Sequence, residues 1–231
     1  MLSKNQVKLI QKLQQKKYRN ELNLFIVEGK KSIVEFLQAG YRLELLIATE
    51  VFGTALNNHP ITLVSKEELR KVSSLKNPGE GLAIFHQRQH KGILQEGVIL
   101  ALDNVQDPGN LGTLICNTQT VDCYNPKVVQ ATMGSLTRVA VHYVDLAGFL
   151  ATCALPLYAM DLDGENLYTT EFPEDCVLIL GNEANGISPE VRALADGIIT
   201  IPRFGKLQQT ESLNVAMAGA IVVSQVRKLE N

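Results

Sequence analysis

The 231-residue sequence lacks the features that mark several large classes of protein. Its four cysteines are scattered without paired spacing, so they indicate neither a disulfide framework nor a zinc site. The apolar runs are too short and too interrupted to span a bilayer, and the first residues lack the apolar core of a signal peptide. We therefore expect a cytoplasmic protein with no membrane partner and no metal.

Charge is also scarce. Charged residues make up 20% of the chain, hydrophobic residues make up 45%, and the formal net charge is −2. These values are ordinary for a soluble globular protein and do not indicate a nucleic-acid binder. Any basic patch must therefore be local. The first thirty-one residues are the candidate region, since they hold eight lysines and arginines against two glutamates.

Lysines recur every four residues at the start of the chain. Lys4, Lys8, Lys12 and Lys16 would form one basic stripe on a helix. Such spacing commonly marks a solvated helix face, and the spacing alone favours that interpretation. The other interpretation is an edge that contacts phosphates, because lysine contacts supply much of the affinity for nucleic acids.

Short apolar runs alternating with helical patterns predict an α/β organisation in two domains. Residues 1–90 form a small α/β domain, residues 91–97 a polar linker, and residues 98–231 a second domain. In the first domain we expect strands at 24–27, 45–48, 61–64 and 81–85, and helices at 30–38 and 66–72. His86 and His90 are four apart, but no third metal ligand is evident, so we interpret them as exposed linker residues.

The second domain contains three continuous apolar runs, at 98–102, 176–180 and 197–201. Such runs are typical of parallel strands that are buried on both faces and covered by helices. A loop rich in Gly, Asn and Pro follows each run, and open α/β sheets bind ligands at these carboxyl ends. The three loops therefore predict one composite ligand site.

No glycine-rich phosphate loop is present in this domain. No G-x-G-x-x-G follows the first strand, and no Gly-Lys-Ser/Thr triplet occurs anywhere in the chain. A dinucleotide-dependent oxidoreductase is therefore left with only the generic α/β pattern in its favour.

The three loops carry distinctive motifs: Asp-Pro-Gly-Asn-Leu-Gly at 107–112, Gly-Asn-Glu-Ala-Asn-Gly-Ile-Ser at 181–188, and Ile-Pro-Arg-Phe-Gly at 201–205 leading to Ser-Leu-Asn-Val at 212–215. Each glycine or asparagine, taken singly, is more often a turn or cap residue. Together and in this order the motifs resemble those of the SpoU (TrmH-type) RNA methyltransferases of the SPOUT class. The resemblance extends to the N-terminal domain, where Lys17-x-Arg19 and Phe25-x-x-Glu28-Gly29 are similar to the family's ribosomal-protein-like substrate-binding module.

This resemblance implies an enzyme that uses S-adenosyl-L-methionine to methylate a ribose 2′-hydroxyl in ribosomal or transfer RNA. It further implies a homodimer whose C-terminal chain end forms a trefoil knot, whereas sequence physics alone predicts an unknotted sheet. The implied cofactor pocket is lined by Leu180, Gly181, Glu183, Gly186, Ile187, Ile201 and Leu213. The implied transfer-site residues are Asn110, Glu183, Ser212 and Asn214, and we expect RNA contacts from Lys12, Lys16, Lys17 and Arg19.

One position departs from the family pattern. Similar proteins carry an arginine six residues after the asparagine of the first motif, and here that position is Cys116. We interpret Cys116 as a small packing residue rather than a substitute base. The alternative function is therefore a catalytically impaired relative that binds RNA without modifying it.

The same region is also short. A parallel strand after residues 98–102 requires a crossover of roughly a dozen residues or more, usually helical. Residues 110–115 begin like such a helix but run at once into the polar stretch 117–120. We therefore predict that an internal segment is missing near Ile115–Asn117 and that the backbone is interrupted there. A continuous backbone would refute this prediction and favour the impaired relative.

Overall fold

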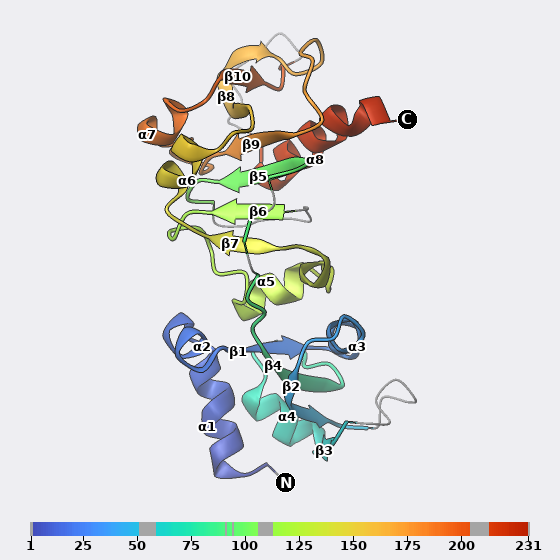
Figure 1. The fold of residues 1–231 in the computed structure, drawn as a ribbon. Coiled ribbons are helices and arrows are strands. Elements are labelled where there is room, and N and C mark those ends of the chain that lie inside the picture. The colour runs from blue at the N-terminus through green and yellow to red at the C-terminus, as the bar shows by residue number, and fades with distance from the viewer. Residues whose placement is uncertain are drawn as a thin grey trace. The chain divides into compact units, whose positions relative to one another are not determined.

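The computed structural model describes residues 2–50, 59–90, 92–93, 95–105, 113–203 and 213–230. Contacts divide the chain into two compact units (Figure 1). Unit 1 comprises Met1–Gln89 together with Asp122–Arg138, and unit 2 comprises His90–Val121 together with Val139–Asn231. The sequence did not predict the return of Asp122–Arg138 to the first unit, because everything after residue 98 was assigned to one domain.

Unit 1 is built on a four-stranded sheet in the order β1-β4-β2-β3. β4 pairs antiparallel with both β1 and β2, and β2 pairs parallel with β3. The strands are β1 (Leu24–Glu28), β2 (Leu43–Ala48), β3 (Thr62–Leu63) and β4 (Gly81–His86). The helices are α1 (Lys4–Leu13), α2 (Lys16–Leu22), α3 (Lys30–Gln38), α4 (Lys66–Val72) and, from the returning segment, α5 (Pro126–Ala131) followed by η2 (Ser135–Arg138).

The N-terminal helical stretch is two helices rather than one. α1 begins at Ser3, which forms a capping box with Gln6, and it buries Ile10 on its inner side. The backbone at Gln15 is extended (φ −102°, ψ 133°), and Lys16 starts the second helix. The prediction of a single stripe of four lysines is therefore wrong, since Lys16 does not continue the helix that carries the other three.

A buried ion pair anchors the returning segment in unit 1. Arg19 is 1% exposed, and its Nε and Nη2 donate to Asp122 Oδ2 at 2.9 and 2.6 Å. Its Nη1 donates to the carbonyl oxygens of Leu13 and Gln14 at 3.0 and 2.9 Å. Because the guanidinium is enclosed and fully engaged, the expectation that Arg19 contacts RNA is wrong.

Aromatic side chains complete this anchor. The ring of Tyr124, in the returning segment, lies 4.4 Å from the ring of Phe25 on β1. Phe25 in turn contacts Phe36, Tyr41 and Phe85. The segment therefore adds apolar area to the core of unit 1 as well as a buried charge pair.

Unit 2 is a six-stranded, all-parallel sheet in the order β10-β8-β9-β5-β6-β7. Helices cover both faces (Figure 1): α6 and α7 pack on one face, and α8 packs on the other. The predicted parallel strands at 98–102, 176–180 and 197–201 and the layered α/β arrangement are confirmed. The elements are β5 (Val98–Leu102), β6 (Thr113–Cys116), β7 (Val141–Tyr143), β8 (Leu157–Asn166), β9 (Cys176–Leu180), β10 (Gly197–Thr200), α6 (Leu146–Thr152), α7 (Pro189–Arg192), α8 (Val215–Val226) and η3 (Arg227–Glu230).

β6 corrects two expectations. Residues 113–116 form a strand in parallel register with β5, where a helix was predicted. Leu114 packs in the core on the α8 face and Ile115 in the core on the α6 face, which is the alternation of a strand. The backbone continues into Asn117, whose N–H donates to the Leu102 carbonyl at 3.2 Å, so the predicted chain break is also wrong.

The connection between β5 and β6 is nevertheless short. Ten residues, 103–112, separate the two strands, and Asp103 to Val105, the part that the structure describes, forms no helix. Parallel neighbours ordinarily need about a dozen residues or more to cross over. This connection is shorter than usual, and it lies before β6 rather than after Ile115, where the missing segment was predicted.

The described residues were compared with the requirements of a membrane-spanning helix and of a metal site. No helix among them is long and apolar enough to cross a membrane. No group of three or more His, Cys, Asp or Glu side chains there could hold a metal ion.

Candidate functional site

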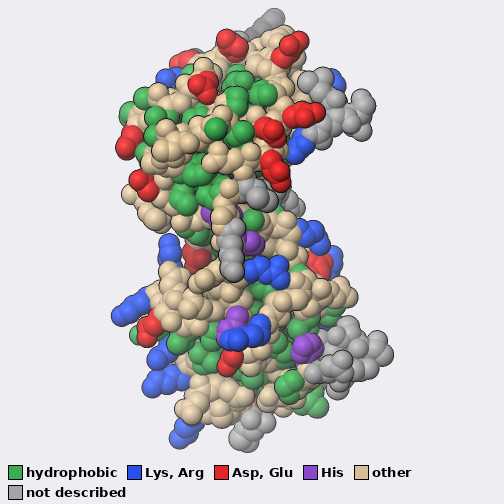
Figure 2. Space-filling view, in the orientation of Figure 1, with side chains coloured by type: hydrophobic (Ala, Val, Ile, Leu, Met, Phe, Trp, Pro, Cys, Tyr) green, Lys and Arg blue, Asp and Glu red, His purple; other side chains and the backbone are tan. Residues whose placement is uncertain are grey.

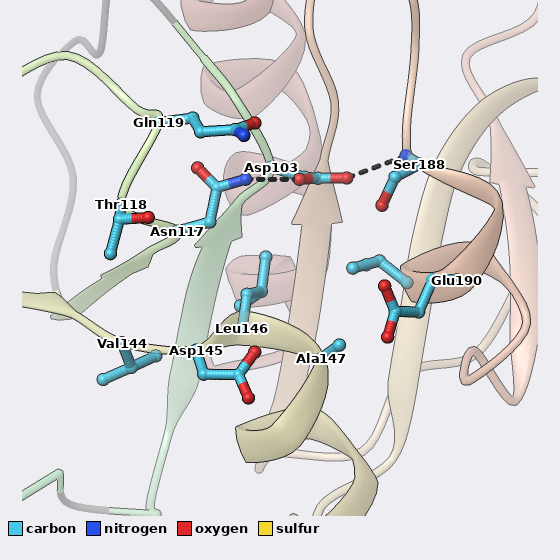
Figure 3. A pocket seen from close by; sticks show the side chains of 11 residues that line it. Asp103, Asn117, Thr118, Gln119, Val144, Asp145, Leu146, Ala147, Ser188 and Glu190 are labelled. Carbon is cyan, nitrogen blue, oxygen red and sulfur yellow. Dashed lines mark hydrogen bonds between the residues drawn. The ribbon is translucent and has the colours of Figure 1, made fainter.

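Loops after three strands of unit 2 are joined by a hydrogen-bond network at the carboxyl edge of the sheet. Asp103, directly after β5, is 4% exposed and accepts from Asn117 Nδ2 at 2.6 Å and from the Ser188 N–H at 2.7 Å (Figure 3). Asn117 Oδ1 in turn accepts from the N–H groups of Asn104 and Thr120 at 3.1 and 2.9 Å. Because each buried polar group is satisfied, the network fixes the three loops relative to one another.

A pocket of about 300 Å³ opens beside this network (Figure 3). Asn117 and Gln119 lie on one side of it, and Leu146 and Ala147 at the start of α6 lie on another. Its lining residues are Asp103, Asn117, Thr118, Gln119, Val144, Asp145, Leu146, Ala147, Ser188, Glu190 and Val191. Three of these carry carboxylates and none carries a cation, so the pocket is unsuited to a phosphate group.

Sequence reasoning did not single out the acidic residues of this pocket. Asp103 directly follows β5, and Asp145 comes two residues after β7 and precedes α6. A carboxylate just beyond the carboxyl end of an apolar strand is the signal that could have found both. Asp145 was missed because β7, the strand before it, is only three residues long and is not recognisable as an apolar run.

The loop after β9 closes on itself and needs glycine at its first position. A Cβ at Gly181 would lie 2.3 Å from the carbonyl carbon of Gly186, a distance that no side chain can adopt. Asn182 and Gly186 exchange backbone hydrogen bonds of 3.0 and 2.8 Å. The side chain of Asn182 also donates to the Asn104 carbonyl at 3.0 Å, so the loop is attached to the loop after β5. This leaves Glu183 exposed on the loop.

The surroundings of Gly186 are open. Its φ is +69°, and a Cβ built there would meet no atom within 4 Å. Leu180 and Ile187, on either side of the loop, are buried at 3% and 7% exposure. Leu180 and Ile201 belong to one apolar cluster with Val215, the first residue of α8. The structure therefore brings the end of β9, which leads into the second motif, into one apolar cluster with parts of the third motif that lie far away in the sequence.

The predicted transfer-site residues are only partly placed. Asn110 and Ser212 lie outside the described residues. Asn214 is exposed and caps α8, where its side-chain oxygen accepts from the N–H groups of Ala216 and Met217 at 3.0 and 3.4 Å. Leu213, immediately before this cap, is 46% exposed.

Cys116 is unsuited to act as a base. It is 1% exposed within β6, and burial raises the pKa of its thiol to about 12. A thiol with that pKa stays protonated near neutral pH and cannot accept a proton. The structure therefore supports the interpretation of Cys116 as a packing residue.

The predicted RNA-contacting lysines gather around a tyrosine in unit 1. Lys12 Nζ and Lys17 Nζ lie 5.2 and 5.8 Å from the centre of the Tyr18 ring. Lys16 and Lys17 are exposed, and Lys12 is half-buried. Tyr18 was not predicted, although an aromatic residue between two cations is a common arrangement in nucleic-acid binding.

The two units carry opposite charge. Unit 1 has sixteen lysines and arginines against nine acidic residues, a net charge of +7, and unit 2 has six against fifteen, a net charge of −9. On the face shown in Figure 2, Lys and Arg side chains follow the edge formed by α1 and α2, whereas acidic side chains gather over unit 2. The net charge of the whole chain is therefore small because the positive charge of unit 1 and the negative charge of unit 2 nearly cancel.

Comparison with known proteins gives two family matches along the chain. Residues 97–224 match the SpoU rRNA Methylase family, and residues 4–83 match the MRM3-like substrate binding domain. The chain is 30% identical to the Bacillus subtilis 23S rRNA (guanosine(2553)-2′-O)-methyltransferase RlmP over 246 aligned positions, which cover 97% of each protein. That alignment is longer than this chain, so the relative has residues with no counterpart here.

Solved structures agree with these matches over nearly the full length. A TrmH-family protein from Porphyromonas gingivalis superposes with a TM-score of 0.89 at 34% identity, covering 99% of both chains. An AdoMet-bound rRNA methyltransferase from Sinorhizobium meliloti superposes with a TM-score of 0.85 at 26% identity, covering 99% of this chain and 96% of the other. The sheet of unit 2, its closed loop after β9 and these similarities together show that the chain belongs to the SpoU rRNA methylase family.

Proposed function

We propose that this chain transfers a methyl group from S-adenosyl-L-methionine to a ribose 2′-hydroxyl of ribosomal or transfer RNA. The observation that carries the proposal is the closed loop Gly181–Ile187 with open space beside Gly186, within the part of the chain that matches the SpoU family. The Bacillus relative is named as a 2′-O-methyltransferase of 23S rRNA, and the Sinorhizobium structure contains AdoMet.

The residues around Gly186 fit such a cofactor. We assign apolar contact with the cofactor to Leu180, Ile187 and Ile201, and contact with its adenine to the N–H and carbonyl groups of the loop backbone. Gly181 and Leu213 complete the set that we propose for the pocket. When bound, S-adenosyl-L-methionine would supply an electrophilic methyl group on a sulfonium centre.

The protein's own task is to orient the ribose and to manage its proton. A ribose hydroxyl is a poor nucleophile, so a group with acceptor capacity must hold its proton during transfer. We assign this role to the exposed carboxylate of Glu183, with Asn110, Ser212 and Asn214 holding the ribose by hydrogen bonds. Positioning of the two reactants then supplies much of the rate.

The resemblance also supports a cytoplasmic homodimer with a C-terminal trefoil knot. α8 is apolar on its exposed side as well as its buried side: Met217 is 59% exposed, and Ala220 is also exposed one turn further on. An apolar helix face of this kind is typical of a protein interface. Light scattering should report a dimer at micromolar concentration, and a monomer would contradict this part of the proposal.

A second function has a specific observation in its favour. The ten-residue β5–β6 connection is too short for a normal helical crossover, and Cys116 cannot replace a missing base. These facts favour a relative that binds cofactor and RNA without transferring the methyl group.

Labelled S-adenosyl-L-methionine and an unmodified RNA transcript separate the two functions. The proposed enzyme incorporates label into RNA. Cofactor binding by calorimetry without any incorporation would identify the impaired relative instead. Absence of cofactor binding would contradict both.

A further inference from the structure

Met133 combines backbone strain with exposure in a way that no other described residue does. Among the residues that the structure describes, three other than glycine have positive φ: Asn23, Asn104 and Met133, at 58° or below. Asparagine tolerates this left-handed conformation because its short polar side chain bonds locally, but methionine has no such compensation. Met133 is nevertheless kept at φ +44°, directly before Gly134 at φ +87°.

The turn around Met133 is well defined. Met133 follows Thr132, the C-cap of α5, so it occupies the position after a helix end where glycine is usual. The Ser135 N–H donates to the Thr132 carbonyl at 2.8 Å, and Thr137 donates twice to the Gly134 carbonyl, at 3.0 Å from its N–H and at 2.7 Å from its hydroxyl. The left-handed backbone is therefore imposed by a hydrogen-bonded turn.

Packing does not explain the choice of methionine. Its side chain is 65% exposed, more than that of any other large hydrophobic residue among those that the structure describes. At this position glycine or asparagine would relieve the strain, and neither substitution would disturb the core. Neither core packing nor the backbone conformation therefore accounts for a methionine at this position.

The charge around this turn selects the partner. Residues 123–138 contain two cations, Lys127 and Arg138, and no acidic residue, but the Glu35 carboxylate of α3 lies against Gly134. Lys127 is exposed, and the Arg138 side chain is 68% exposed, with its guanidinium 3.8 Å from Glu35. Both belong to unit 1, whose net charge is +7. An exposed apolar side chain on a basic unit, with a cation on each side of it in the sequence, fits RNA, with bases for the thioether and phosphates for the cations.

We propose that Met133 packs against an unstacked base of the bound RNA, while Lys127 and Arg138 contact the adjoining phosphates. This inference rests on the proposed function, which requires an RNA substrate. Proteins that unstack bases commonly insert apolar side chains, methionine among them, and enzymes that modify nucleotides must first expose them. The flexible thioether can follow the face of any base, so the contact positions RNA without reading its sequence.

The test uses substitutions of Met133 that relieve its backbone strain. Met133→Asn and Met133→Gly remove the apolar side chain and relax the backbone, so both variants should melt at the same temperature as the wild type or higher. We expect their affinity for an unmodified 23S rRNA transcript to fall about tenfold, the effect of removing one stacked base. Leu63→Asn is the matched control: Leu63 is also in unit 1 and 54% exposed, and its replacement should leave RNA affinity unchanged.

Salt dependence separates the two kinds of contact. Met133→Asn should keep the wild-type slope of affinity against salt, whereas Lys127→Gln with Arg138→Gln should reduce it. Unchanged RNA affinity in Met133→Asn overturns the inference and leaves the proposed function intact if the wild type still methylates RNA. A Met133→Asn variant that loses self-association but not RNA affinity places Met133 in a protein interface and also overturns the inference. A wild type that binds no RNA overturns both.

Discussion

The two units of this chain differ in charge and in how they bury polar groups. Unit 1 carries a net charge of +7, and its core encloses the Arg19–Asp122 ion pair beside a cluster of aromatic rings. Unit 2 carries −9, its sheet core is aliphatic, and its buried polar groups gather where the strands end. The difference supports a division of labour that we propose, in which the basic unit binds RNA and the acidic unit binds the cofactor.

The largest effect should come from the buried anchor of unit 1. Arg19→Met leaves Asp122 enclosed without its cation, and such a loss costs about 3–5 kcal/mol of unfolding free energy. Urea denaturation followed by near-ultraviolet signals should show this loss. Lys17→Met, an exposed neighbour, should change stability by less than about 0.5 kcal/mol. Adding Asp122→Leu to Arg19→Met should recover most of the loss, and no recovery would mean that the ion pair is not the anchor.

Cofactor binding should depend on unit 2 alone. Gly186→Val places a branched side chain in the space that we assign to the ligand, so affinity should fall about a hundredfold, or about 3 kcal/mol. Calorimetry with S-adenosylhomocysteine measures this directly. Gly92→Val is the matched control, because Gly92 has the same φ of +69° and equally empty surroundings in the same unit. Equal effects of the two substitutions would show that backbone strain, rather than pocket filling, is responsible.

RNA binding should depend on unit 1. Replacing Lys12, Lys16 and Lys17 with glutamine should weaken RNA binding and lower the salt slope by about 0.7–0.9 for each phosphate that the variant no longer neutralises. Cofactor affinity should not change. The control replaces three cations on α4 of the same unit: Lys66, Arg70 and Lys71. Unchanged RNA affinity in the first variant would identify the lysines as a solvated helix face.

The smallest effect is expected at Cys116. Cys116→Ala removes one buried sulfur and should cost about 1 kcal/mol of stability without altering methyl transfer or its pH profile. Because burial raises the pKa of this thiol to about 12, iodoacetamide at pH 8 should leave it unmodified in the folded protein. Mass spectrometry should find the label on the partly exposed Cys153 instead. A shifted pH profile in the variant would contradict the packing role.

The sequence predicted the central strands of unit 2 because their pattern of hydrophobic residues is distinctive. β5 and β9 are continuous apolar runs of five residues, which are typical of parallel strands buried on both faces. β8 was not predicted from the sequence because its second half, Asp-Leu-Asp-Gly-Glu-Asn, is polar. This stretch is largely exposed and pairs with a neighbouring strand along one edge only. β6 was not predicted because its three apolar residues, Leu114 to Cys116, form a run too short to distinguish a strand from a helix.

Features that depend on tertiary contact could not be predicted. Arg19 reads as one of a cluster of basic residues, and nothing local shows that Asp122, more than a hundred positions away, encloses it. The same holds for the returning segment Asp122–Arg138, whose place in unit 1 rests on that ion pair and on the ring of Tyr124. The glycines of the candidate ligand loop after β9 were visible in the sequence because the requirement for glycine at Gly181 and Gly186 is set by the backbone of that loop.

The position of the transferred methyl group tests the central claim most directly. The full chain is incubated with labelled S-adenosyl-L-methionine and an unmodified 23S rRNA transcript, and the RNA is then hydrolysed with alkali. A methyl group on the 2′-oxygen blocks cleavage at that nucleotide, because cleavage requires the free hydroxyl. The account predicts label in an alkali-resistant dinucleotide. Label in mononucleotides, or none in RNA that the protein binds together with the cofactor, would contradict it.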